Sequence, residues 1–178
     1  MLFEWAHRDA AHVRPALETF ECTHGLARYQ AGGSRDWRQR HDKWWEYEVQ
    51  SAIHKLKAPK PGSDRVLLLG WSGAHLGGVS LYQETDGSSQ VELELMALSV
   101  YFRGARQGHA AEMVRETLED IERRALAVDV PDTLVTGYIW HQNSASKRMV
   151  EASGFTCTGE GAQGVELWSQ LLVHPLPL

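Results

Sequence analysis

The sequence predicts one α/β domain built around a mixed sheet. Short apolar runs with strand character alternate with segments whose apolar residues recur at helical spacing, in the order β-α-β-β-β-α-β-α-β-β. The chain has 178 residues, of which 43% are apolar and 23% charged, as is ordinary for a globular protein with a real core. We therefore expect residues 1–178 to form a single domain.

The first sixty residues contain two expected elements. Residues 16–23, ALETFECT, are a weak candidate for a first strand, because charged residues disturb the apolar alternation. A helix is expected from Asp36, capped by Asp36 or Ser34, to the prolines at positions 59 and 61. Its apolar stripe consists of Trp45, Val49, Ala52, Ile53 and Leu56.

Three strands are expected next, over residues 65–71, 76–83 and 90–100. The stretch GWSGAHLGG, residues 70–78, has the look of a dinucleotide-binding loop, but a strand follows it instead of a helix, so we interpret it as a hairpin. In the third strand, regular alternation places two sets of side chains on opposite faces: Leu93, Leu95 and Ala97 on one, and Glu92, Glu94 and Met96 on the other.

The second half of the chain alternates helices and strands. A long helix is expected to about Val128, with surface ion pairs Glu119–Arg123 and Asp120–Arg124. Its apolar stripe consists of Ala110, Val114, Leu118, Ile121 and Ala125. A strand over 132–141, a short helix ended by Gly154, and strands over 155–160 and 164–173 complete the chain.

Composition and charge argue against several classes of protein. The formal net charge of -5 disfavours a nucleic-acid-binding surface. The N-terminus lacks the apolar segment of a signal peptide, and no apolar stretch approaches the roughly 18 residues of a membrane helix. Cys22 and Cys157 make neither a disulfide framework nor a zinc set, and the nine histidines show no metal-binding spacing. We expect a cytoplasmic protein that binds no membrane, nucleic acid or metal.

The stretch FRGARQGHAAEM, residues 102–113, lies where the third of these strands turns into the long helix. A helix start presents unpaired backbone N–H groups at the positive end of the helix dipole. Gly104 and Gly108 would let an anion approach these groups, and Arg103 and Arg106 could donate to phosphate oxygens. The pattern is therefore typical both of a phosphate site and of an ordinary turn that carries solvated arginines.

Two motifs in this half of the chain resemble those of the GCN5-related N-acetyltransferase (GNAT) superfamily. The segment from Arg103 to Gly108 is similar to its acyl-CoA-binding motif, R/Q-x-x-G-x-G/A, with Arg106 in place of the first motif glycine. Residues 141–155, HQNSASKRMVEASGF, are similar to its pattern N-x-x-A/S-x-x-x-Y-x-x-x-G-F at Asn143, Ser146, Gly154 and Phe155. The resemblance covers about residues 64–172, whereas residues 1–60, on the acceptor side, match only loosely.

This resemblance implies a sheet splayed between its fourth and fifth strands, here about residues 91–100 and 133–141, with the pantetheine arm of acetyl-CoA in the gap. The arm would pair with the backbone of Met96, Ala97 and Leu98, and the Leu98 N–H would stabilise the oxyanion. The side chains of Asn143 and Ser146 would lie beside it. The pyrophosphate would lie next to Arg103 on a loop made of Gly104, Ala105, Arg106, Gln107, Gly108 and His109.

The chemistry implied is direct attack of a neutral primary amine on the thioester, which requires a base. The candidate bases are Glu92, Glu94 and His141. The alternative is that the two acids lie on a solvated sheet face and that His141 is a surface histidine. Val150 stands where the family usually has a tyrosine acid. Tyr101, Ser146 or water could replace it, or the thiolate could leave unaided.

Three functions follow from these motifs. An N-acetyltransferase is the first, acting on a small cationic amine or on a peptide or protein amine. Val150 and Arg106 leave open a CoA-binding regulatory module without activity, and an acyltransferase toxin acting on aminoacyl-tRNA is disfavoured by the net acidity. Trp44, Trp45 and Tyr47 would be either core packing or an aromatic wall of the acceptor site. The family resemblance also allows a homodimer.

Overall fold

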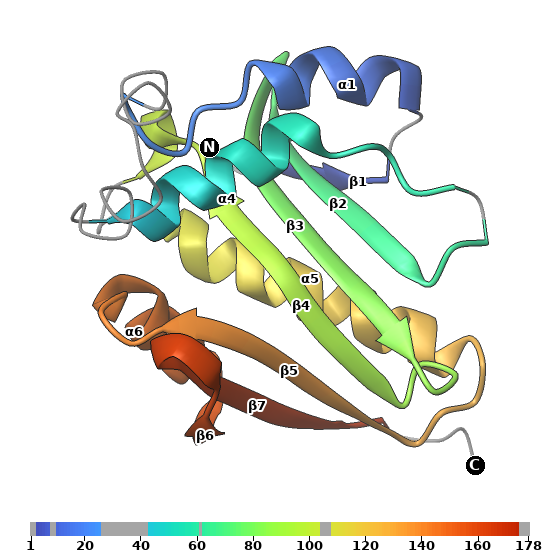
Figure 1. Cartoon of the computed structure of the whole chain (residues 1–178). Helices are drawn as coiled ribbons and strands as arrows, with labels where there is room; N and C mark the ends of the chain where they lie inside the picture. The colour runs from blue at the N-terminus through green and yellow to red at the C-terminus, as the bar shows by residue number, and fades with distance from the viewer. Residues whose placement is uncertain (1–2, 8–9, 26–42, 61, 104–107, 175–178) are drawn as a thin grey trace.

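The computed structural model describes residues 3–7, 10–25, 43–60, 62–103 and 108–174 (Figure 1). One seven-stranded sheet has the order β1-β2-β3-β4-β5-β7-β6. Only β4 and β5 pair in parallel; the other neighbours are antiparallel, which confirms the predicted mixed sheet. The strands are β1 Glu4–Ala6, β2 Arg65–Ser72, β3 His75–Thr85, β4 Gln90–Leu98, β5 Asp132–Trp140, β6 Thr156–Glu160 and β7 Val165–Val173.

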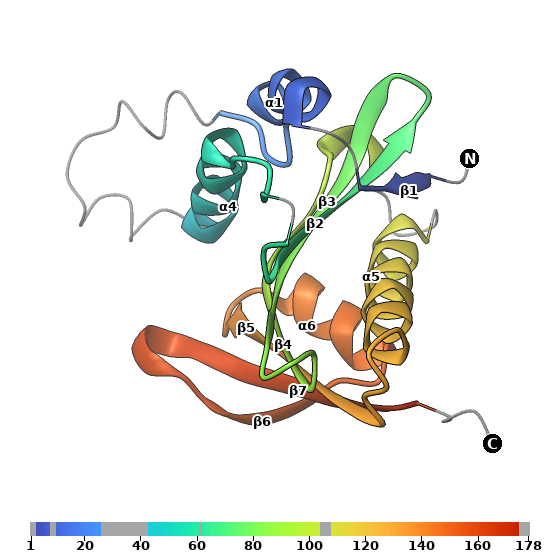
Figure 2. The same ribbon diagram turned by 90° about the vertical axis from the view of Figure 1, so that its right-hand side faces the viewer.

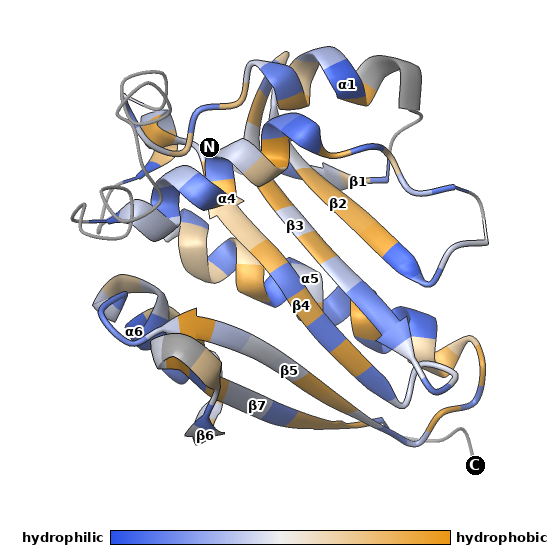
Figure 3. Ribbon diagram, viewed as in Figure 1, coloured by the Kyte–Doolittle hydropathy of each residue, from blue (hydrophilic) through white to orange (hydrophobic). Residues whose placement is uncertain are grey.

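Helices cover both faces of the sheet (Figure 2). The helices α1 (Ala10–Glu18) and α4 (Trp44–Lys55) pack on one face, and α5 (His109–Leu126) and α6 (Ser144–Ala152) on the other. Two short 3-10 turns, Val100–Phe102 and Ala162–Gly164, follow β4 and precede β7. Most of β2 is hydrophobic (Figure 3) and all but its first residue is buried, as expected for a strand covered on both sides.

The N-terminal segment differs from its prediction. The expected strand over residues 16–23 is wrong, because residues 10–18 form α1. Val13, Leu17 and Phe20 recur at helical spacing and are buried in the core shared with α4. A strand that periodicity did not reveal, β1, pairs with β2 instead. The expected helix is present as α4, but its predicted start at Asp36 and the cap candidates lie outside the described residues.

The glycines of GWSGAHLGG make room for β1. The hairpin of β2 and β3 is confirmed, with Gly73 and Ala74 in its turn. A Cβ on Gly78 would lie 2.6 Å from the indole of Trp5, and one on Gly77 would lie 2.3 Å from the ring of Phe3. These glycines therefore allow close packing of Phe3, just before β1, and of Trp5, within it, against the hairpin.

A β-bulge in β4 overturns the predicted faces of this strand. Leu95 pairs with Leu81 and Leu93 with Tyr82, so Glu94 is the extra residue. As a result Leu95 and Ala97 face the core under α1 and α4, whereas Leu93 and Met96 face the core under α5 and α6. The expectation that Leu93, Leu95 and Ala97 share a face was wrong, because alternation does not continue through a bulge.

The helix α5 is anchored by a buried carboxylate and not by the predicted surface ion pairs. Asp120 is buried and accepts hydrogen bonds from the Tyr82 hydroxyl at 2.6 Å and from Arg123 Nη1 at 2.7 Å. Its Oδ1 also lies 3.2 Å from Nε2 of His7. The predicted partner Arg124 pairs with Glu84 instead. Because the Asp120 carboxylate points inward from α5, its contacts with Tyr82 and His7 connect the helix to β3 and to the segment after β1.

Candidate functional site

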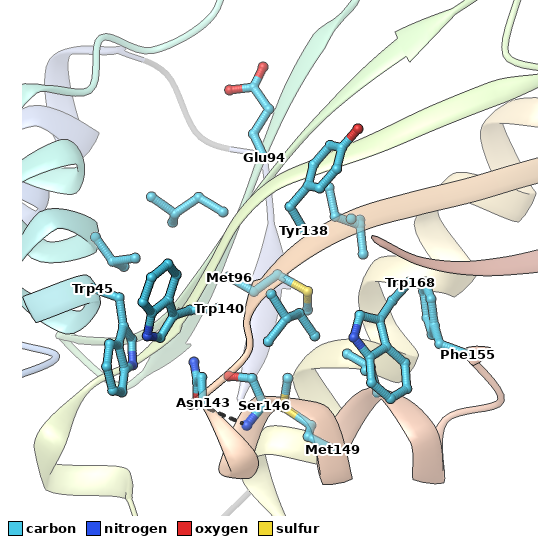
Figure 4. A pocket seen from close by; sticks show the side chains of 16 residues that line it. Trp45, Glu94, Met96, Tyr138, Trp140, Asn143, Ser146, Met149, Phe155 and Trp168 are labelled. Atoms are coloured by element: carbon cyan, nitrogen blue, oxygen red, sulfur yellow. Dashed lines mark hydrogen bonds between the residues drawn. The ribbon is translucent and has the colours of Figure 1, made fainter. Parts of the chain in front are cut away.

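The site lies where β4 and β5 separate. Their parallel ladder ends at the pair Leu93 and Gly137, although β4 continues to Leu98 and β5 to Trp140 (Figure 1). A pocket of about 760 Å³, part of it open to solvent, occupies the opening (Figure 4).

The pocket has walls on both faces of the sheet. On the α6 side, the wall includes Leu93, Met96, Met149, Val150, Phe155 and Trp168, all of which belong to the core under α5 and α6. On the α4 side, Trp45 and Val49 come from the helix and Leu95 from the other core. Tyr138 and Trp140 alternate with Ile139 of β5 and complete the α4-side wall. The opening therefore connects the two faces.

Backbone donors of β4 face this opening. The Ser99 N–H donates to the Gly77 carbonyl at 2.8 Å, so the Ala97 N–H points to β3 as well. By the same alternation, the N–H groups of Met96 and Leu98 point to the side from which β5 has turned away. Met96 lines the pocket, and Leu98 lies just beyond its wall.

Polar groups at the start of α6 border the α6 side. Asn143 caps the helix, because its side-chain oxygen accepts from the Ser146 N–H at 3.2 Å (Figure 4). Its side-chain nitrogen donates to no described residue, and both Asn143 and Ser146 line the pocket. This amide is therefore free to donate to a ligand.

The predicted phosphate loop is described only at its two ends, because residues 104–107 lie outside the described residues. Gly108 precedes α5 with a left-handed φ of 70°. His109 is buried against Phe3, with Nδ1 3.3 Å from a Glu112 oxygen. Arg103 donates from Nη1 to Glu46 of α4 at 3.0 Å and from Nε to the Leu98 carbonyl at 3.3 Å.

The three candidate bases have different surroundings. Glu94 is the one acid in the described wall, and Nε of Arg65 lies 2.8 and 2.9 Å from its two oxygens. Glu92 is exposed outside the wall. His141 is exposed beside Trp140, with Nδ1 2.7 Å from the Gly164 carbonyl. A carbonyl only accepts, so Nδ1 is the donor, and in the neutral imidazole the lone pair is then on Nε2.

The position of the usual tyrosine acid is apolar. Val150 is buried and lines the pocket. Tyr101, a candidate replacement, is 77% exposed and lies outside the wall, whereas Ser146 lies within it. Tyr138 is 55% exposed and also lines the pocket.

An aromatic cluster forms the α4-side wall, as one sequence alternative had allowed. Trp140 contacts Trp44 and Trp45, with ring centroids 5.0 and 6.3 Å apart. The indole N–H groups of Trp45 and Trp140 are buried and have no hydrogen-bond partner among the described residues. Tyr47 does not line the pocket. Trp140 and Trp168 were not predicted as site residues from the sequence. The one signal that could have indicated them is their position on predicted strands near Asn143 and the helix that follows it.

No helix among the described residues is long and apolar enough to span a membrane. A group of three or more His, Cys, Asp or Glu side chains suited to a metal ion is also absent from that part of the chain. The described wall of the pocket consists mainly of apolar and aromatic side chains and has few polar groups. Such a composition is typical of a site for an organic ligand.

Comparison with known proteins identifies the fold. No family model matches the chain, and no curated protein matches it. Among solved structures, the PaiA N-acetyltransferase of Thermoplasma acidophilum in complex with coenzyme A is similar, with a TM-score of 0.63, 13% identity, and coverage of 96% of this chain and 99% of that chain. The ribosomal-protein-S18-alanine N-acetyltransferase of Escherichia coli has a TM-score of 0.61, 12% identity, and coverage of 98% and 96%.

A third similar structure is the GNAT domain of S. lividans PAT, with a TM-score of 0.63, 14% identity, and coverage of 96% of this chain and 90% of that chain. All three similarities extend over nearly the whole of this chain, so they include its mixed sheet. The fold of this protein is therefore the fold of the GNAT acetyltransferases.

Proposed function

We propose that this protein is a cytoplasmic member of the GNAT superfamily that transfers an acetyl group from acetyl-CoA to a primary amine. The observation that carries the proposal is the pocket that passes between β4 and β5 and has walls on both faces of the sheet. Such an opening lets a donor and an acceptor meet from opposite sides, so that proximity supplies much of the rate. Cys22 and Cys157 are free thiols, as is usual in a reducing compartment.

The α6 side suits the donor. The backbone N–H groups of Met96 and Leu98 would pair with the pantetheine arm, together with the free amide of Asn143. Of the two backbone donors, Met96 lies in the wall, so its N–H is the better placed to stabilise the oxyanion, with Leu98 next to it. The start of α5 after Gly108 would receive the pyrophosphate, with the motif residues Gly104, Ala105, Arg106 and Gln107 around it.

The reaction would proceed by direct attack. The amine nitrogen forms a bond to the thioester carbonyl carbon, the carbon–sulfur bond breaks, and the CoA thiolate leaves. Glu94 would take the proton of the amine, directly or through water, because it is the acid of the described wall. The Nε2 lone pair of His141 is the second candidate, and Glu92 is the third. Val150 supplies no proton, so the thiolate would be protonated by Ser146 or by water.

A binding measurement followed by an assay tests this proposal. Acetyl-CoA at about 100 times its Kd should stabilise the protein by about 2.7 kcal/mol, whereas NADPH and ATP should not. Release of the CoA thiol should then depend on an added amine. Glu94→Gln should lower kcat/KM by about 100-fold, the lower limit expected for a lost base. Glu92→Gln and His141→Gln test the other two candidate bases in the same assay.

Val150 supports one second candidate, a module that binds acetyl-CoA without turnover. Stabilisation by acetyl-CoA together with no thiol release for any amine would favour that module over the enzyme. If neither acetyl-CoA nor CoA stabilises the protein, both candidates fail, and only the fold is shared with the acetyltransferases.

A further inference from the structure

We propose that the acceptor is an arylalkylamine, a primary amine with an aromatic ring a short alkyl chain away from the nitrogen. This inference rests on the proposed function and assigns the substrate class of the same site. It derives from the α4-side wall, whose described side chains are Trp45, Val49, Leu95, Tyr138 and Trp140, with Glu94 at the bulge. Five of these six side chains are apolar or aromatic, so the body of the acceptor should be apolar too.

The charges near this wall oppose a polycationic acceptor. Glu94 is engaged by Arg65 through both carboxylate oxygens. Glu46, in the first turn of α4, is engaged by Arg103 at 3.0 Å. A polyamine or aminosugar would need several unpaired carboxylates in the wall to replace the hydration of its ammonium groups. The described residues of the wall offer one carboxylate, which is already paired.

The aromatic wall is held in place before a ligand arrives. Trp140 packs against Trp44 and against Gly164, whose Cβ, if present, would lie 3.1 Å from the indole. The helix that carries Trp45 is fixed by the buried side chain of Gln50, which accepts from the N–H groups of Cys22 and Thr23 at 3.0 and 2.7 Å. A rigid wall binds a flat ring at little cost in conformational entropy.

This wall also suits the chemistry of attack. Only the neutral amine is nucleophilic, and an apolar environment disfavours the ammonium form. An aromatic ring packed against the wall formed by Trp45 and Trp140 would place a nitrogen on a short chain near the opening at Leu95 and Met96. A ring attached directly to the nitrogen would lack that reach, which is why we assign an arylalkylamine and not an arylamine.

The test compares matched amines with acetyl-CoA held at saturation, with CoA thiol release as the readout. We expect kcat/KM for 2-phenylethylamine and tryptamine to exceed that for n-butylamine and spermidine by about tenfold or more, the scale on which an apolar pocket discriminates. Trp45→Ala and Trp140→Ala should each reduce that preference by about tenfold. The conservative Trp45→Phe and Trp140→Phe variants should retain most of it, which separates ring packing from a loss of fold.

Two tryptophans elsewhere provide controls. Trp168→Phe changes the α6-side wall, so it should raise the KM for acetyl-CoA and leave the preference among amines unchanged. Trp5→Phe changes a ring on β1, outside the pocket, and should alter neither quantity. Equal or better turnover of spermidine, or a preference that survives Trp45→Ala and Trp140→Ala, would overturn the inference and leave the proposed function intact. Binding of acetyl-CoA with no amine acetylated would overturn both.

Discussion

The two halves of β4 have different roles. Residues Gln90–Leu93 are hydrogen-bonded to β5 in register and support the sheet. Residues 94–98 continue along β3, but β5 has turned away from them, and a bulge at Glu94 marks the change. In the first half the backbone groups hold the fold together, whereas in the second half they face a pocket. The comparison teaches that in this protein the candidate site is the place where the ladder stops.

The same contrast applies to the polar groups of the two regions. Around Asp120, under the paired part of the sheet, every described contact is internal, from Tyr82, His7 and Arg123. Beside the open half, the amide of Asn143 and the N–H groups of Met96 and Leu98 keep donors free. Substitutions in the first region should therefore change stability, and those in the second should change ligand binding.

Loss of the buried carboxylate should give the largest effect. Asp120→Ala leaves the Tyr82 hydroxyl and His7 without their acceptor, so we expect a loss of about 3 kcal/mol in the free energy of unfolding. Urea unfolding measures it, and the Kd of acetyl-CoA for the folded variant should change less than about twofold, about 0.4 kcal/mol. The exposed Glu119→Ala, which breaks only a surface pair with Arg115, is the control on the same helix. A loss no larger than that of Glu119→Ala would contradict the structural role.

The second largest effect is expected from a larger side chain at the point where β4 and β5 diverge. Gly137 lines the pocket opposite Leu93, and a Cβ there would lie 3.4 Å from the Leu93 Cβ. The extra methyl groups of Gly137→Val should weaken acetyl-CoA binding by about tenfold or more, about 1.4 kcal/mol. Isothermal titration checks this, with Gly159→Val as control because a Cβ on Gly159 meets no atom within 4 Å. Unchanged affinity would place acetyl-CoA elsewhere.

Asn143 both caps α6 and lines the pocket, and two variants separate these roles. Asn143→Ala removes the cap of α6 and should cost about 1 kcal/mol of stability. Asn143→Asp keeps a capping oxygen but has no amide N–H, so it should retain stability and lose affinity for acetyl-CoA. Thermal unfolding and titration distinguish the two effects. Full affinity in Asn143→Asp would reduce this residue to a helix cap.

The smallest effect should be a pH dependence in the paired region. The hydrogen bond to Asp120 and the charge of that carboxylate raise the pKa of His7 above 6.5, against its partial burial. For Asp120, burial favours the neutral acid, but the hydrogen bonds and charges of its partners outweigh burial and lower the pKa. The contribution of His7 is therefore complete below its unfolded pKa of about 6.5 and disappears as the pH rises through the raised folded value.

The stability difference between wild type and His7→Gln should follow that direction. It should be greatest near pH 5 and shrink towards pH 9, and it should remain below about 1 kcal/mol because His7 is about half exposed. Urea unfolding across this range measures it, with His75→Gln in the hairpin as a control. A difference that grows with pH would contradict the pairing.

The sequence by itself determined the order of elements from β2 to β7 and the identity of the fold. Each of these strands and helices has its own periodicity and is bounded by glycine, proline or a capping residue, as at Pro131, Asn143 and Gly154. Such signals are local, so they can be read before the chain is folded. The two motifs that led to the GNAT resemblance are local for the same reason.

Only the tertiary structure decided the faces of β4 and the partners of the charged side chains. The bulge at Glu94 exists because β3 pairs across it, and nothing within the strand sequence announces it. Glu94 meets Arg65 across 29 positions and Arg103 meets Glu46 across 57. The aromatic wall joins Trp45 of α4 to Trp140 of β5. Contacts of this kind depend on which distant segments pack together, and the order of residues along the chain does not encode that in any local pattern.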